Sequence, residues 1–211
     1  MLTSFQWRWG VAQWVEFLKD KEIPVLLRTQ ALLQALASLD SASTEAISAR
    51  ELAGYVFADP YLSLKLLRHA ENRRSRRLGQ ETTTTLAAVL HTGWNELVQL
   101  VSASSVSDDS CKGRNDCEFR AVLASSIARG WAGLRSDVSP DEVALAALLS
   151  ESGELLLWYF APELPLKVAD ELASGRAFRP LRAQEQAIGF TFRQMTVALV
   201  EAWELPPIIT Q

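Results

Sequence analysis

Cysteine and histidine are scarce in this chain, and their scarcity excludes several classes of site. The 211 residues include two cysteines and two histidines. Two cysteines cannot form a disulfide framework, and no His-Glu-x-x-His or paired Cys-x-x-Cys spacing for zinc is present. We predict that Cys111 and Cys117 are free thiols. We also expect His69 and His91 to be packed or surface side chains and not metal ligands.

Motifs for phosphate binding and nucleophilic catalysis are missing as well. The ten glycines are scattered singly along the chain, so there is no glycine-rich phosphate loop. No serine lies in a Gly-x-Ser-x-Gly phrase, the pattern that exposes a nucleophilic hydroxyl on a sharp turn. We therefore predict that the chain is not an enzyme and has no catalytic residue, no bound metal and no cofactor.

The chain has neither an excess of basic residues nor a long apolar run. Lys and Arg number 21 against 25 Asp and Glu, for a net charge of −4, which disfavours nucleic acid as a partner. No apolar run reaches the roughly 18–20 residues needed to cross a bilayer. The first 24 residues mix charges into their apolar positions, which is not typical of a signal peptide. We expect no membrane association and a cytoplasmic location.

Strand patterns are nearly missing, whereas helical periodicity runs along the whole chain. Near the start, an i, i+4, i+7, i+11 spacing predicts one helix whose buried face carries Trp7, Val11, Trp14 and Leu18. Pro24 is suited to the first turn of a second helix, which we expect to run through Leu39.

Further helix boundaries are marked by capping signals. Ser48 and Glu51 match a capping box. Asp59-Pro60 and Ser139-Pro140 each combine a capping side chain with a proline that is tolerated in the first turn. A last helix is predicted to begin near Phe192 and to bury one face as far as Trp203.

A polar stretch at about 102–118 interrupts this pattern and offers turn formers but little to bury. We interpret it as a loop between two packed helical lobes, at about 1–104 and 118–211. The predicted fold class is all-α, a multi-helix bundle in two lobes that together form a single domain over residues 1–211.

Several segments, taken in order, resemble the HDOD (HD-related output domain) family of bacterial signalling proteins. The first contains a proline at the start of a helix, the second is centred on Asp-Pro, and the last ends in a Leu-x-x-x-Trp-x-Leu-Pro phrase. The resembling segments are residues 23–37, 51–72, 86–101, 142–157 and 185–206. The resemblance implies an HD-like helical bundle and a role in signalling.

The resemblance also implies where this chain departs from the HD superfamily. The His-Asp pair that holds a metal in HD phosphohydrolases aligns with Ser150 and Glu151, and a later histidine aligns with Phe192. Serine is a poor metal ligand and phenylalanine is none, so we expect a divergent member with a degenerate site. Glu151 with Glu154 could form an acid/base pair on adjacent turns. An acidic first helical turn is the favoured interpretation.

Two surface features are candidate binding sites. An arginine run follows the Asp-Pro segment and is interpreted as a solvated helix end or as a site for an acidic partner or a phosphate. This run comprises Arg68, Arg73, Arg74, Arg76 and Arg77. Phe5 and Trp9, four residues apart and off the predicted buried face, form a candidate apolar interface.

These observations favour a non-catalytic signalling or scaffold module that acts by binding proteins. The expected partners are signalling proteins, with a second copy of the chain as another candidate. Signalling follows from the resemblance alone, since fold does not fix function. Two alternatives stay open: a metal-dependent phosphohydrolase with a rearranged carboxylate site, and a nucleotide or nucleic-acid binder that uses the Arg73–Arg77 run.

Overall fold

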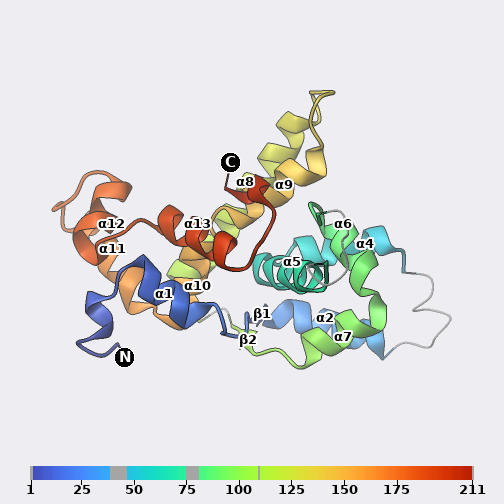
Figure 1. Cartoon of the computed structure of the whole chain (residues 1–211), viewed down its shortest axis with the longest axis horizontal. Helices are drawn as coiled ribbons and strands as arrows, with labels where there is room; N and C mark the ends of the chain where they lie inside the picture. The colour runs from blue at the N-terminus through green and yellow to red at the C-terminus, as the bar shows by residue number, and fades with distance from the viewer. Residues whose placement is uncertain (1, 39–46, 75–80, 109, 211) are drawn as a thin grey trace.

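The computed structural model describes residues 2–38, 47–74, 81–108 and 110–210, and nearly all of its regular structure is helical (Figure 1). The predicted all-α class is confirmed. Two short strands, β1 (Val25–Leu26) and β2 (Val106–Ser107), pair in parallel. The helices are α1 (Val11–Leu18), α2 (Leu27–Ala37), α4 (Ala49–Phe57), α5 (Pro60–Arg74), α6 (Thr85–Thr92), α7 (Trp94–Ser102), α8 (Lys112–Ala132), α9 (Pro140–Leu149), α10 (Ser152–Phe160), α11 (Glu163–Ala173), α12 (Pro180–Ile188) and α13 (Phe192–Ala202).

The predicted caps are present and satisfy backbone groups that a helix end leaves without partners. The Glu51 N–H donates to Ser48 Oγ at 3.2 Å, and the Ser48 N–H donates to Glu51 Oε2 at 2.8 Å, which completes the capping box. Asp59 caps α5, because its Oδ1 accepts from the Leu62 N–H at 3.0 Å. Its other oxygen accepts from the Leu26 N–H at 2.8 Å and so ties β1 to the start of α5.

Two apolar cores share α5, which lies at the centre of the molecule (Figure 1). One side of α5 contributes Tyr61 and Leu64 to a larger core that also contains α1 and α8–α13. The other side contributes Leu62 and Leu66 to a smaller core built with α2, α4, α6 and α7. The two packed lobes expected from the sequence are therefore present, and a single helix belongs to both.

The N-terminal residues depart from the prediction. Trp7 lies in a 3-10 turn (Gln6–Arg8) and is 38% exposed, whereas Trp14 and Leu18 are buried in α1. Gly10 caps α1 with an extended backbone, so Trp7 lies outside the helix that was expected to include it. Because α1 packs in the larger core against α13, assigning the first residues to the first lobe was wrong.

Two predicted boundaries are also corrected. Residues 102–118 are not a loop throughout, because α8 begins at Lys112 and already buries Arg114 and Cys117. The helix expected to begin at Pro24 begins at Leu27 instead. β1 intervenes there because its backbone bonds to β2 and to Asp59.

One stretch of the described residues, Pro140–Phe160, meets the length and composition criteria for a membrane-spanning helix. It comprises α9 and α10, and 56% of the apolar window is buried inside the molecule. Leu148, Leu149 and Leu157 on these helices belong to the larger core. The hydropathy of this stretch therefore reflects its place in the core.

Candidate functional site

One pocket of about 640 Å³ is lined by the adjacent residues Ser150 and Glu151 and by Phe192, about forty residues later in the chain. One wall is charged and comes from α8 and α10. The opposite wall is apolar and comes from α11 and α12, with Val168 and Leu181 among its residues. The three positions predicted from the resemblance are thus brought together by the fold.

Local packing explains why these positions meet. Ser150 and Glu151 occupy the short break between α9 and α10. A Cβ at Gly153 would lie 2.5 Å from the Phe192 carbonyl oxygen, so only glycine lets α10 approach α13 this closely. The Gly153 N–H donates to Thr196 Oγ1 at 2.9 Å, which fixes the approach. Phe192, at the start of α13, is therefore held at the pocket beside the α9–α10 break.

An arginine from α8 forms ion pairs with the two glutamates of this pocket. Arg120 donates to Glu154 Oε2 at 2.7 Å and lies 3.3 Å from Glu151 Oε2. The Trp158 indole N–H donates to the other oxygen of Glu154 at 3.1 Å. Both oxygens of Glu154 thus have donors, and one guanidinium contacts two acidic side chains.

The protonation of these groups follows from burial and from their mutual charges. Burial raises the pKa of Glu151, the negative charge of Glu154 adds to this, and Arg120 opposes it only in part. Burial alone would lower the pKa of Arg120, but the adjacent Glu154 and Glu151 carboxylates raise it above its ordinary value. The guanidinium is therefore a permanent cation at this position.

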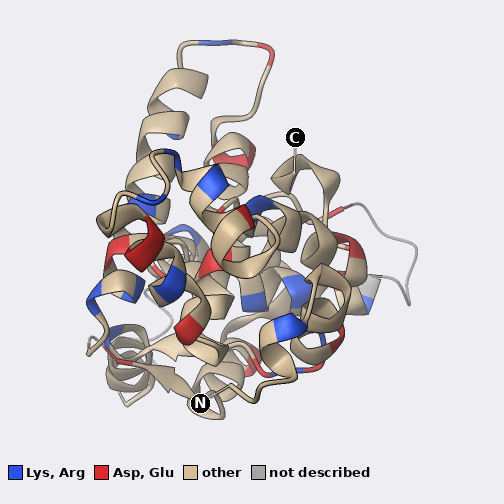
Figure 2. Ribbon diagram, turned by 90° about the vertical axis from the view of Figure 1, so that its left-hand side faces the viewer, with Lys and Arg blue, Asp and Glu red and all other residues tan. Residues whose placement is uncertain are grey.

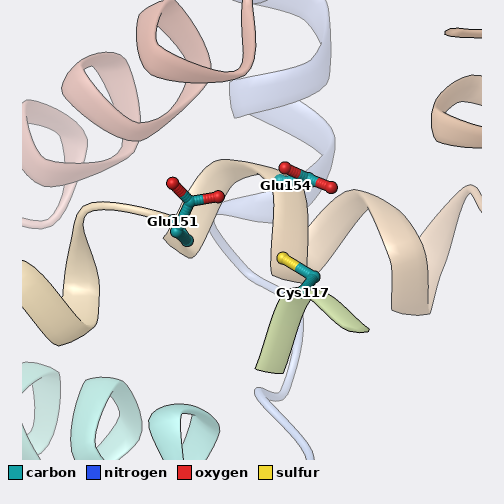
Figure 3. A group of neighbouring side chains, drawn as sticks. All are labelled: Cys117, Glu151 and Glu154. Atoms are coloured by element: carbon teal, nitrogen blue, oxygen red, sulfur yellow. The ribbon is translucent and has the colours of Figure 1, made fainter. Parts of the chain in front are cut away.

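Cys117, Glu151 and Glu154 place one potential ligand atom each within 4.8 Å of one another (Figure 3). These residues nevertheless do not fit a divalent metal. Burial and the nearby carboxylate of Glu154 raise the pKa of the Cys117 thiol, and a neutral thiol is a poor metal ligand. Arg120 already forms ion pairs with both carboxylates, and neither described histidine belongs to the group. The short distances reflect an internal ion-pair cluster.

The sequence did not point to Arg120 or Cys117 as residues of this site. Both lie on α8, and the sequence pattern predicts a loop for the segment that contains Cys117. Their three-residue spacing places them on adjoining turns of a helix, but this signal has meaning only once the segment is known to be helical. Cys111 and Cys117 are both free, as predicted.

The arginine run does not form a single exposed cluster in the described residues. Arg68 is half-buried over the Trp203 ring and donates to the carbonyl oxygens of Lys19 and Lys21. Its guanidinium joins the chain after α1 to the end of α13, which gives Arg68 a structural role, and its role in binding a partner stays a prediction. Arg73 pairs with Glu96.

The rest of the arginine run lies partly or wholly outside the described residues. The side chain of Arg74 and the whole of Arg76 and Arg77 lie outside the described residues. His69 is partly exposed and lies 3.0 Å from Glu96 Oε1, so it shares an acidic partner with Arg73.

The candidate aromatic interface is divided between surface and core. Phe5 is exposed, but Trp9 is half-buried and packs against the larger core. The Trp9 ring centroid lies 5.0 Å from that of Trp14 and 5.8 Å from that of Phe17. The predicted exposure of Trp9 is therefore wrong, because its indole closes the aromatic cluster around α1. A role for Trp9 in an interface stays a prediction.

Comparison with known proteins agrees with this architecture. The MmoQ response regulator from Methylococcus capsulatus superimposes with a TM-score of 0.67 at 21% identity, over 90% of this chain and 76% of that one. A virulence factor (cj0248) from Campylobacter jejuni gives a TM-score of 0.69 at 19% identity, over 95% and 73% of the two chains. At sequence identities this low, the structural similarity establishes only that the fold is shared. No curated protein matched the chain.

A sequence profile of the HDOD domain matches residues 32–211, which covers most of the chain. The region includes α5, the α9–α10 break and α13, so it contains the elements that build the pocket. The chain belongs to the HDOD family.

Proposed function

We propose that this HDOD chain is a non-catalytic signalling or scaffold module of the cytoplasm that acts by binding another protein. The observation that carries the proposal is the Arg120 guanidinium bound to Glu151 and Glu154 at the position of the HD site. A guanidinium there engages the carboxylates that a metal at this place would need as ligands. The likeness in fold to a protein named as a response regulator supports a signalling role.

An activity assay distinguishes this proposal from the phosphohydrolase alternative. Phosphomonoesters and phosphodiesters would be incubated with the full chain and Mn²⁺, Mg²⁺ or Fe²⁺, beside the variants Glu151→Gln and Glu154→Gln. We expect the same background rate from all three proteins. Turnover by the unmodified chain that both variants lose would contradict the proposal and would establish a metal-dependent hydrolase.

Protein binding is tested by a pull-down from a lysate of the source organism with the tagged full chain, with and without nuclease. We expect a nuclease-resistant protein partner. Retention of nucleic acid alone, lost at high salt, would support the nucleic-acid alternative. Retention of no macromolecule would contradict a binding function.

A further inference from the structure

α8 carries large apolar side chains on the face that points away from the molecule. The exposed fractions are 68% for Phe119, 47% for Leu123, 44% for Ile127 and 73% for Trp131. Their four-residue spacing places them on a single ridge along three turns of the helix. Monomeric proteins rarely expose so continuous an apolar surface, which marks an interaction site.

The surroundings of this ridge leave it accessible. The end of α8 and the start of α9 form a hairpin that projects from the body of the molecule (Figure 1). Between Arg120 and Arg129 the helix has no charged residue. The exposed residues beside the ridge in this stretch are small, Ala124 and Ser126, so another helix can approach closely. Charge is concentrated at the tip of the hairpin (Figure 2).

The ridge is complementary to itself. Its four residues are spaced evenly about a midpoint at residue 125, so a two-fold axis there places Phe119 beside Trp131 of the partner and Leu123 beside Ile127 of the partner. Each ridge then fits into the groove next to the other, as packed helices do. A two-fold contact also closes after two copies and leaves no ridge exposed.

The charges at the two ends of the ridge favour an antiparallel pair. Lys112 and Asp116 pair with each other at the start of α8, and Arg135 pairs with Asp137 at 2.6 Å beyond its end. About the same two-fold axis, the Lys112–Asp116 pair of one chain lies at the same end of the ridge as the Arg135–Asp137 pair of the partner. Each end thereby gains opposite charges, which fixes the orientation more than it adds affinity.

We propose that α8 binds α8 of a second copy of this chain and forms an antiparallel homodimer through the ridge Phe119–Trp131. This inference does not depend on the proposed function.

Phe119 and Trp131 offer about 200–350 Å² of exposed surface per chain, at 150–250 Å² for each fully exposed aromatic side chain. A contact of three helical turns therefore falls at the lower end of specific interfaces, about 1,000 Å² in total, and its dissociation constant is expected in the micromolar range.

Sedimentation velocity of the full chain from about 1 to about 200 µM tests the dimer across the range expected of a small interface. We expect a shift from monomer to dimer. Leu123→Glu, which puts two like charges beside the two-fold axis, raises the dissociation constant at least about tenfold. The matched control is Phe178→Glu, which changes a 91% exposed aromatic residue outside α8 and leaves the dimer intact. Equal thermal midpoints of the two variants show that both are folded.

Orientation is tested by cross-linking in a Cys111→Ser background. Phe119→Cys and Trp131→Cys chains form a disulfide when mixed, and neither does so efficiently alone, because the antiparallel pair joins position 119 to position 131. A chain that stays monomeric at the highest concentration would overturn the proposal and leave a different protein as the occupant of the ridge. A dimer that Leu123→Glu leaves unchanged, or that cross-links at like positions, would overturn it equally.

Discussion

The two longest described helices, α5 and α8, differ in which of their side chains they bury. α5 buries its large apolar residues on two sides, in two different cores. α8 buries mainly small or polar side chains and exposes its large apolar ones. The buried residues of α8 are Arg114, Cys117, Glu118, Ala121, Ser125 and Ala132, and its exposed apolar ridge is Phe119, Leu123, Ile127 and Trp131.

This difference separates stability from recognition. Apolar area that is removed from water stabilises the fold, so the large residues of α5 contribute most to the single chain. The large residues of α8 contribute little until another molecule covers them. Small residues on its inner face let α9 pack closely, and the same arrangement leaves the bulky side chains outside. Substitutions on the two helices test whether they divide the roles in this way.

The largest expected contrast is between Leu66→Ala on α5 and Leu123→Ala on α8. Leu66 is fully buried, so its truncation removes apolar contacts and leaves a cavity, lowering the free energy of unfolding by about 3–4 kcal/mol. Leu123 is 47% exposed, and its truncation is expected to cost less than about 1 kcal/mol. Urea unfolding at low protein concentration measures both changes. Similar losses for the two variants would contradict the division of roles.

Asp59→Ala is expected to cost about 2–3 kcal/mol, because the Leu62 and Leu26 N–H groups would then lie buried without an acceptor. Asp59→Asn retains one acceptor oxygen at nearly the same size and should lose about half as much. The same unfolding measurement applies. A loss from Asp59→Ala below that of an exposed surface substitution would show that the link between β1 and α5 is dispensable.

Trp9→Ala is expected to destabilise the chain by about 2 kcal/mol, since the ring packs with Trp14 and Phe17 against the larger core. Phe5→Ala, at an exposed ring, should stay within about 0.5 kcal/mol. The thermal midpoints of both variants check the difference. An unchanged midpoint for Trp9→Ala would restore the interpretation of Trp9 as an interface residue.

The smallest expected effect is a pH dependence at Glu151. Its pKa in the folded chain lies above the ordinary value, so the native state holds this proton more tightly than the unfolded chain does. The stability present below the unfolded pKa is therefore lost as pH rises through the raised pKa. Glu151→Gln should match the unmodified chain near pH 4 and exceed it at pH 7 by a few tenths of a kcal/mol, after solvent screening.

Denaturation series at the two pH values measure this difference. Glu185→Gln is a suitable control, because that glutamate is half exposed and pairs with Arg182 on the surface of α12. The opposite result would be a Glu151→Gln variant that is less stable than the unmodified chain at pH 7 but equally stable at pH 4. It would show that the ion pair with Arg120 stabilises the Glu151 carboxylate by more than its burial costs.

Local signals predicted most of the fold. The caps at Ser48, Asp59 and Ser139 depend on side chains within three residues, so the sequence alone indicates them. Trp7 was assigned to the wrong element because the apolar spacing continues across Gly10, whereas α1 begins only after that residue. The start of α8 was missed because its polar side chains are buried against partners distant in sequence, as Glu118 is near Arg28.

The candidate site was predicted in part. Ser150, Glu151 and Phe192 came from the resemblance, and the fold places all three at one pocket. Arg120 was not foreseen, because the two carboxylates that it binds lie more than thirty residues away in sequence. The exposed ridge of α8 was not foreseen either, because a stripe of large apolar residues at helical spacing normally marks a buried face.

The role of Arg120 at the pocket is tested most directly by the metal content of the full chain after dialysis against Mn²⁺, Fe²⁺ or Zn²⁺, measured by inductively coupled plasma mass spectrometry. We expect less than about 0.1 equivalent, because Arg120 holds Glu151 and Glu154. We also expect Arg120→Ala to bind more metal than the unmodified chain. About one equivalent in the unmodified chain, lost in Glu151→Gln and Glu154→Gln, would show instead that the pocket is a metal site.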